Sequence, residues 1–466
     1  MIKSSYSVRI SFPVFMIFLN IIFGGMFMRS SNKLIFSVLI MILTLVLISF
    51  PVFSEEFFGG NIDWTQFSGQ EIRLIMCEHW YTNGLKPIVS EFENKTGIKV
   101  IFDIYPEEAF YTKVRVELAG AQPTMDGFMI GSLDMGSYTA ANWLEPLNPF
   151  FENKNLVDDE WYDFQDLYPS AIDGGTHQGK LLVLPVGAEA EVMAYRKDIL
   201  EEKGLSVPNT YEELYDAAKK IKTDDMAGYV SRGLRGLSIV WEWSGFLLSY
   251  GGRYFDENGN PFFNSPEGIA ATDIYTKLLM ETGPSGVVNY GWQEVIASAQ
   301  QGKAGILIEA SGALPPLEGD ESVVKGKIGY AQIPAGPNQE RIPNYWFWNL
   351  AMNPYSEKKD ATFLFLTWAT SKPVFLKIAR DSGVSGARLS VWSDSEFFEK
   401  QNKEWIDTCI ESMSFVKADL IPYLNAKYPE IADSISVELQ NVIIGAKSSK
   451  EALDESAKQV ADLLKK

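Results

Sequence analysis

Between residues 73 and 130 the chain alternates short apolar runs with amphipathic segments, and this alternation limits the possible folds more than any other feature of the sequence. Residues 73–77, 98–104 and 128–130 are rich in branched and aromatic side chains, which is typical of buried strands. Apolar residues recur at helical spacing from Leu85 to Phe92, and a second helix is expected around residues 113–118. Alternating strands and helices are typical of a parallel sheet covered by helices. The sequence therefore predicts an α/β fold.

After residue 200 the pattern becomes mainly helical. Thr210 and Glu213 have the spacing of an N-terminal capping box, and Pro266 stands at the first turn of another predicted helix. Helices are expected at residues 211–221, from 266 onward, and at 293–301, 358–369, 396–413 and 449–464. An N-terminal α/β part followed by a mainly helical C-terminal part indicates two lobes.

The charge balance argues against several classes of partner. The chain has 41 Lys and Arg residues against 60 Asp and Glu residues, which gives a net charge of -19. Such a surface repels phosphate backbones and works against anionic ligands. Nucleic acid is therefore not expected as a partner.

Histidine and cysteine are scarce. The two histidines, His79 and His177, and the two cysteines, Cys77 and Cys409, cannot build a His-rich zinc site or a Cys-rich cluster. No metal and no cofactor is expected. Cys77 ends an apolar run and is interpreted as a small core residue, while a Cys77–Cys409 disulfide stays open as the alternative.

Two apolar stretches, residues 10–28 and 34–52, precede the predicted α/β part. The second stretch has a basic segment before it and Val-Phe-Ser just ahead of Glu55, as in a secretory signal peptide. Residues 28–54 are therefore predicted to be a signal peptide, and residues 1–27 an upstream over-extension. The alternative is a membrane hairpin, since each stretch approaches the ~20 residues needed to span a bilayer. A periplasmic or extracellular protein is expected, membrane-tethered if these segments are retained.

Three segments carry a family resemblance. They are IRLIMCEHWYTNGLKPIVSEFENKTGIKVIFD from residue 72, PTMDGFMIGSLDMGSYTAANWLEPLNPF from residue 123, and GTHQGKLLVLPVGAEAEVMAYRKDIL from residue 175. In this order they resemble the extracellular solute-binding proteins of carbohydrate ABC importers, a maltose-binding-protein-like family. The resemblance covers most of the chain after residue 71.

The resemblance implies a two-lobed periplasmic-binding-protein fold, in which each lobe is a sheet flanked by helices and a cleft between the lobes holds a sugar. It places the chain crossings near residues 185–189, 308–311 and 353–357. It assigns residues 55–187 with 312–357 to the N-terminal lobe and residues 188–311 with 358–466 to the C-terminal lobe. It also implies ABC permease subunits as partners of a monomer.

A sugar site needs aromatic faces for the C–H surfaces of the ligand and polar groups for its hydroxyls. Residues of both kinds follow predicted strands or lie in loop-like stretches, among them the stretch 241–243 after Gly236. Glu189 matches the hinge glutamate of the family. The predicted ligand-binding residues are Glu78, His79, Trp80, Asp134, Glu189, Trp241, Trp243, Glu309, Trp346, Trp348, Asn349 and Arg388. For the aromatic residues the alternative is an ordinary core position.

A carbohydrate-active enzyme is the competing interpretation. Glu189 and Glu191 are two residues apart on a predicted strand, and paired carboxyls about 5–9.5 Å apart are what a glycoside hydrolase needs. However, no G-x-S-x-G or H-E-x-x-H motif occurs. We therefore expect a receptor that binds a neutral sugar or polyol, and not an enzyme.

Overall fold

The computed structural model describes residues 57–120 and 124–465. The two apolar stretches and the predicted signal peptide lie outside this part of the chain. Among the described residues, no helix has both the length and the apolarity that crossing a bilayer requires.

The first three strands form the predicted parallel α/β unit. They are β1 (Glu71–Cys77), β2 (Lys99–Tyr105) and β3 (Gly127–Gly131), with β1 between the other two. The helices α3 (Trp80–Leu85) and α4 (Val89–Thr96) connect β1 to β2, and α5 (Glu107–Ala119) connects β2 to β3. Phe92 and the apolar β1 side chains are buried, so the apolar periodicity read from the sequence marks the face that packs on the sheet.

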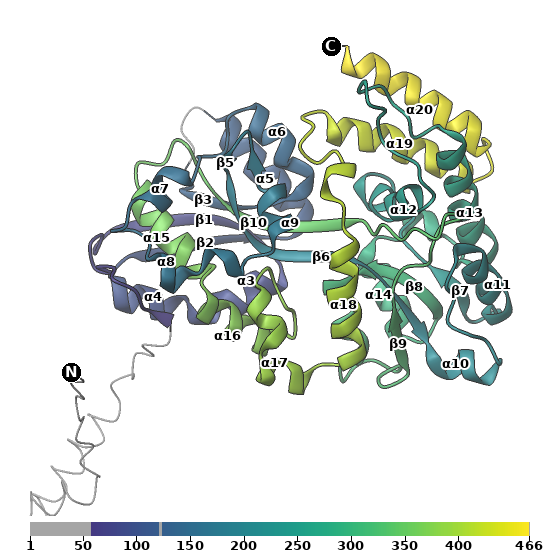
Figure 1. The fold of residues 1–466 in the computed structure, drawn as a ribbon, viewed down its shortest axis with the longest axis horizontal. Helices are drawn as coiled ribbons and strands as arrows, with labels where there is room; N and C mark the ends of the chain where they lie inside the picture. Colours follow the sequence, from purple (N-terminus) through teal and green to yellow (C-terminus); the bar gives the residue numbers. More distant parts are fainter. Residues whose placement is uncertain (1–56, 121–123, 466) are drawn as a thin grey trace, which may run out of the picture. The chain divides into compact units, whose positions relative to one another are not determined.

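All long strands belong to one sheet of order β2-β1-β3-β10-β6-β8-β7, with β9 also paired to β6. The further strands are β6 (Val183–Arg196), β7 (Ala227–Val230), β8 (Ala304–Ala310), β9 (Ile328–Ala331) and β10 (Tyr345–Met352), and a separate hairpin joins β4 (Thr176–His177) to β5 (Lys180–Leu181). The strand β6 pairs with β10 as far as Ala190 and with β8 from Glu191 onward. It therefore joins a first group of strands (β1–β3 and β10) to a second group (β7–β9), as Figure 1 shows.

Three positions were predicted at which the chain crosses between the two groups. Only the crossing in β6 lies close to its predicted position. The chain returns at Asn344–Tyr345, where β10 begins. Residues 353–357 instead lie within the first group, because Asn353 donates its backbone N–H to the carbonyl of Asp126 at 2.9 Å. Residues 308–311 stay in the second group, since the chain continues from β8 to β9. A further crossing lies between α17 (Ser395–Lys400) and α18 (Lys403–Phe415), which splits the predicted helix 396–413.

Two helices predicted for the C-terminal lobe pack on the first group instead. They are α15 (Lys359–Ala369) and α16 (Lys372–Ser382). The ring centroids of Phe365 and Phe92 are 5.1 Å apart, and those of Phe375 and Tyr81 are 5.8 Å apart. This corrects the expected lobe boundary at residue 358, because aromatic side chains of both helices complete the core of the first group.

Four of the remaining helices were predicted, namely α11 (Tyr211–Ile221), α13 (Pro266–Thr282), α14 (Trp292–Gln300) and α20 (Ser449–Leu464). No range was predicted for the others, which are α6 (Met135–Ala140), α7 (Asn148–Glu152), α8 (Asp159–Tyr162), α9 (Pro169–Gly174), α10 (Lys197–Glu202), α12 (Leu237–Ser249) and α19 (Tyr428–Ile443). Thr210 caps α11 by accepting the N–H of Glu213, but the Glu213 carboxylate accepts the N–H of Asn209. In a standard capping box the Glu213 carboxylate would accept the N–H of the N-cap residue Thr210. Here it accepts the N–H of the preceding residue instead.

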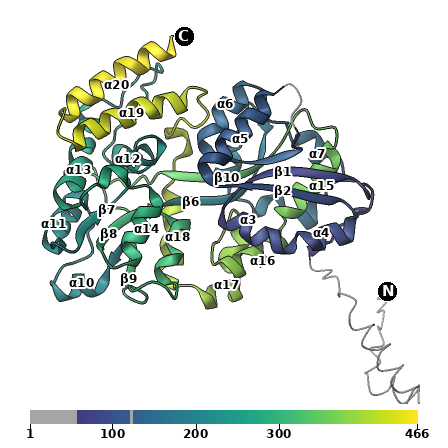
Figure 2. The ribbon, with the colours of Figure 1, turned by 180° about the vertical axis from the view of Figure 1, so that it is seen from behind.

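The stretch 241–243, predicted to be loop-like, lies inside α12. This helix is buried from Ile239 to Ser249 and packs against α13 and α19, which can be followed in Figure 2. A helix buried on all sides is apolar on all sides and lacks the periodicity of an amphipathic helix. The prediction was wrong for that reason.

Candidate functional site

Predicted site residues of three elements meet where β1 ends and β10 begins. Trp80 donates its indole N–H to Oε1 of Glu189 at 3.5 Å. The His79 ring lies 5.0 Å from the rings of both Trp80 and Trp348, and the rings of Trp346 and Trp348 are 5.9 Å apart. We call these five residues the aromatic–carboxylate cluster. The sequence placed them far apart, and the sheet brings them together.

Two glycines make this packing possible. A Cβ on Gly131, the last residue of β3, would lie 2.5 Å from the Trp346 ring. A Cβ on Gly312 would lie 2.5 Å from Oε1 of Glu189. Side chains at these positions would displace the aromatic–carboxylate cluster.

Glu189 is largely withdrawn from water, with 9% of its surface exposed. Burial raises the pKa of its carboxyl to about 7, while the Trp80 N–H and the charge of Arg232 act in the opposite direction. Near neutral pH this carboxyl therefore exchanges between a form that only accepts hydrogen bonds and a form that also donates one. Both forms can pair with hydroxyl groups.

His79 also has a structural role. Its Nδ1 accepts the N–H of Tyr81 at 3.3 Å and caps α3. Burial lowers the pKa of the imidazole well below its ordinary value, so the ring is neutral at physiological pH. The sequence suggested only a loop histidine that could reach a hydroxyl.

Tyr111 is a member of this region that the sequence did not reveal. Its ring is stacked on that of Trp348, with centroids 6.2 Å apart and an interplanar angle of 20°. Its hydroxyl donates to Glu107 at 3.5 Å. The helix was predicted only around residues 113–118, but α5 begins at Glu107, directly after β2, where polar residues of a site would be expected.

Glu309 and Trp241 hold an arginine that was also missed. Arg232 makes two charge-assisted hydrogen bonds to the Glu309 carboxylate, one of them at 3.0 Å through Nε. Its guanidinium lies 4.2 Å from the centroid of the Trp241 ring. Glu309 is fully buried, so it positions Arg232 and does not face outward. Arg232 follows β7, and the rule that selected residues after other strands could have found it.

Trp243 and Asn349 are core residues in this structure. The Trp243 indole N–H donates to Thr272 at 2.9 Å inside α12 and α13. The Asn349 side chain donates to the carbonyl of Phe347 at 3.3 Å. Both are buried and neither joins the aromatic–carboxylate cluster, because each points into the packing between elements.

Arg388 does not reach the predicted site either. It is buried in the first group, where it donates to the carbonyls of Thr370 at 2.7 Å and Tyr162 at 2.8 Å. It also donates to the carbonyl of Asp163 and pairs with Asp166 at 3.2 Å. This corrects its predicted role, because its donors are occupied by these backbone and carboxylate oxygens.

Two predicted acidic residues behave differently from each other. Glu78 is exposed at the end of β1. Asp134 is buried and pairs with Arg115 at 3.0 Å. Burial raises the pKa of Asp134, and Arg115 partly offsets that shift. Only Glu78 has a carboxylate that is open to solvent.

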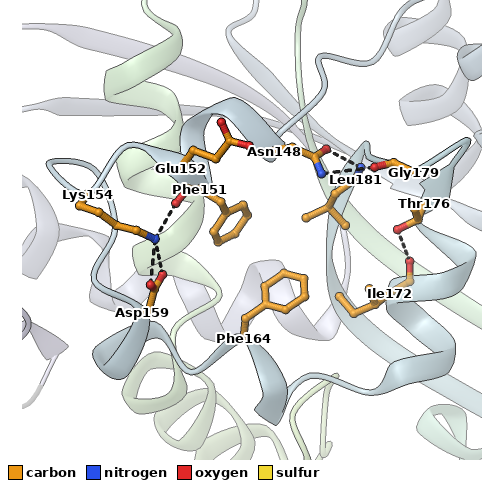
Figure 3. A pocket seen from close by; sticks show the side chains of 10 residues that line it. All are labelled: Asn148, Phe151, Glu152, Lys154, Asp159, Phe164, Ile172, Thr176, Gly179 and Leu181. Atoms are coloured by element: carbon orange, nitrogen blue, oxygen red, sulfur yellow. Dashed lines mark hydrogen bonds and ion pairs between the residues drawn. The ribbon is translucent and has the colours of Figure 1, made fainter.

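The pocket shown in Figure 3 lies elsewhere, in the first group of strands and helices. It has a volume of about 600 Å³ and a floor of Phe151, Phe164, Ile172 and Leu181. Several polar side chains around it are already engaged, Asn148 with Gly179 and Leu181, Lys154 with Asp159, and Thr176 with Ile172, whereas Glu152 is exposed. None of its lining residues was predicted from the sequence. A hollow in which most polar side chains are already bonded to one another leaves few groups for a hydroxyl-rich ligand.

Metal and thiol chemistry find little support in the described part of the chain. No group of three His, Cys, Asp or Glu side chains among residues 57–120 and 124–465 could hold a metal ion. Cys77 and Cys409 are both buried and free, so the disulfide alternative is wrong. Cys77 packs as the small core residue expected from its position in β1.

Several proteins are similar to this chain in sequence or in fold. The erythritol/L-threitol-binding protein of Mycolicibacterium smegmatis is 27% identical over 332 residues, which are 67% of this chain and 69% of that protein. The mannitol-binding protein of Pseudomonas aeruginosa is 30% identical over 313 residues, 65% of this chain and 70% of that protein. The crystal structure of an ABC transporter solute-binding protein from Agrobacterium radiobacter in complex with ribitol has a TM-score of 0.78, with 26% identity over 85% of this chain and 99% of that one.

These likenesses confirm the predicted two-lobed α/β fold. They also favour a binding protein over a glycoside hydrolase, as the sequence predicted. The sequence model of the family described as bacterial extracellular solute-binding proteins matches residues 80–374 of this chain. The chain therefore belongs to the family of bacterial extracellular solute-binding proteins.

Proposed function

We propose that this protein binds a neutral polyol or sugar and delivers it to the permease of an ABC importer. The observation that carries the proposal is the aromatic–carboxylate cluster, in which Glu189 accepts the indole N–H of Trp80 and pairs across the sheet with Trp346, whose ring lies 5.9 Å from that of Trp348. Rings accept the C–H faces of a polyhydroxylated ligand, and the carboxyl pairs with its hydroxyls. The relatives named above, which bind erythritol, L-threitol, mannitol or ribitol, support this class of ligand.

The charges near the cluster favour a neutral ligand. The nearby cations are Arg232, two of whose N–H groups Glu309 occupies, and Arg115, which pairs with Asp134. Glu107 and Glu189 add negative charge beside Arg232. An anionic ligand would therefore meet repulsion from these carboxylates and from a chain with a net charge of -19.

The first prediction tests ligand class and site together. We expect titration calorimetry to detect binding of ribitol or D-mannitol, and not of a sugar phosphate. The Glu189→Ala variant should lose about tenfold to hundredfold in affinity, since a buried hydroxyl left without its partner costs ~1–3 kcal/mol. The matched control is Glu145→Ala, because Glu145 pairs with Lys359 outside the cluster. Tight binding of sugar phosphates without any response to polyols would refute the proposal.

The family membership also supports an extracellular or periplasmic site of action. We infer that residues 28–54 are the export signal and that the monomer docks on permease subunits. The second prediction is a mature chain that begins at or near Glu55, because small or branched residues stand before it as a signal peptidase requires. Intact-mass analysis of the secreted protein checks this. A mass that includes residues 1–54 would instead favour the membrane-tethered form.

A further inference from the structure

Glu191 occupies the position at which β6 changes partners. Its predecessor Ala190 pairs with Tyr345 of β10, whereas Glu191 itself pairs with Ala310 of β8. Its backbone N–H donates to the carbonyl of Asn344 at 3.1 Å. The residue thus stands at the crossing between the two groups of strands.

The Glu191 side chain ties the two crossing strands together. Its Oε2 accepts the backbone N–H of Asn344 at 2.8 Å, directly before β10. Asn344 is itself held by α12, since its side chain donates to the carbonyl of Trp241 at 2.6 Å. Ser412 of α18 donates to the carbonyl of Glu191 at 2.7 Å. Three elements therefore converge on this one buried glutamate.

The other oxygen of this carboxyl lacks a partner. Oε1 of Glu191 and Oε2 of Glu242, in α12, are both buried and accept no hydrogen bond in the structure. Glu242 is also the charge that acts most strongly on Glu191. Gly245, one turn after Glu242, leaves the room in which the Glu191 carboxyl lies against α12. The buried hydroxyl of Ser231 lies beside Glu242 and can serve only one of these two oxygens, so a further donor is needed.

One proton can supply that donor. A protonated carboxyl is a hydrogen-bond donor, so a proton shared between the two glutamates satisfies both orphan oxygens at once. It also removes one of two buried negative charges, which is otherwise costly. We propose that Glu191 and Glu242 form a proton-sharing pair that positions the two strands crossing between the lobes, and that losing this proton loosens the crossing and weakens ligand binding.

The surrounding groups leave this proton in place at neutral pH. The titratable and charged groups around the pair are Glu189 of β6, Glu309 of β8, Arg232 after β7, Tyr229 of β7, Tyr211 of α11, Tyr275 of α13, Tyr254 and Tyr423. Arg232 is the one cation of this set, and Glu309 is bonded to it. The phenols are neutral because burial raises the pKa of each.

The direction of the pH effect follows from burial. It raises the pKa of Glu242 from 4.5 to about 8, and it raises that of Glu191 as well. The folded protein thus holds a proton that the unfolded chain has lost. This stabilisation is fully present below the ordinary carboxyl pKa and is lost as the pH rises through about 8.

The test compares variants that share every other titrating group. Glu189 also titrates near neutrality, so Glu189→Gln serves as the background. The melting temperature of Glu189→Gln should fall by several degrees between about pH 6 and pH 9. The melting temperature of the Glu189→Gln/Glu242→Gln variant should fall much less over the same range. Glu191→Gln in the same background provides an independent second variant. Glu438→Gln is the matched control, because Glu438 is a buried carboxylate paired with Lys447 on neither crossing strand.

Hydrogen exchange locates the effect at the crossing. At about pH 9 the amides at the start of β10 should exchange faster in the wild type than in Glu242→Gln. Because both proteins are measured at the same pH, the intrinsic exchange rate of the amides is the same in both. Affinity for D-mannitol should fall about tenfold from pH 6 to pH 9 in the wild type and less in Glu242→Gln. This last readout rests on the proposed function, whereas melting and exchange use the free protein. Parallel melting profiles, or equal exchange at β10, would overturn the proposal even if mannitol binds.

Discussion

Trp348→Ala should weaken ligand binding by at least tenfold and lower the free energy of unfolding by about 3–5 kcal/mol. The sequence predicted a ligand-binding residue, and the loss of such a residue would affect binding alone. In the structure only 6% of Trp348 is exposed. Its ring contacts those of His79, Phe110 and Tyr111. Its removal therefore leaves a cavity in addition to taking away a stacking surface.

Calorimetry for binding and denaturant unfolding of the ligand-free protein measure the two effects. Trp348→Phe keeps an aromatic face and should show smaller losses in both, so it covers the case in which the alanine variant does not fold. Trp368 is the matched control, because it is fully buried between Phe92 and Phe365, away from the cluster. Trp368→Ala should lose stability but keep its affinity. A Trp348 variant that does the same would be a core residue only.

Arg388→Leu should cost about 3–5 kcal/mol of unfolding free energy and leave ligand affinity unchanged. The substitution removes the donors for the carbonyls of Thr370, Tyr162 and Asp163. It also leaves the buried Asp166 without its cation. Arg388→Lys should rescue little, since one ammonium cannot reproduce the fork of a guanidinium.

The surface ion pair of Arg235 and Asp433 provides the control for Arg388. Both side chains are more than half exposed, so Arg235→Leu should cost less than about 1 kcal/mol. Denaturant unfolding of the three arginine variants gives the comparison. An Arg388→Leu protein of normal stability but reduced affinity would restore the ligand-binding role that the sequence suggested.

The parts of the fold that depend on local pattern could be predicted from the sequence. The strands and helices from β1 to β3 and the capped start of α11 follow from side-chain periodicity and end signals. The partner of β10 could not be predicted in this way. It pairs with β3 and β6, more than a hundred residues away, and neither pairing leaves a local signal. The misplaced crossing at residues 353–357 has the same cause.

For the candidate site, position after a strand was a useful guide, whereas aromatic character selected both cluster members, Trp346 and Trp348, and core residues. His79, Trp80 and Glu189 were selected by strand ends or family position, and they meet in the structure. Trp243 was selected as an aromatic residue beside polar groups and lies in the core. Tyr111 was missed because an expected helix boundary was several residues late. Burial depends on distant packing, and a single sequence does not reveal it.

The place of β10 between β3 and β6 has a consequence for how the chain folds. A nascent chain that ends before Tyr345 lacks the strand that completes the first group, so the edges of β3 and β6 stay without their partner. Contacts of such high sequence separation slow folding, because the loop must close before they form. Neither lobe is then an autonomous folding unit. Fragments cut between β9 and β10 should recover structure only when the two pieces are mixed, and the protein should be a poor source of isolated lobes.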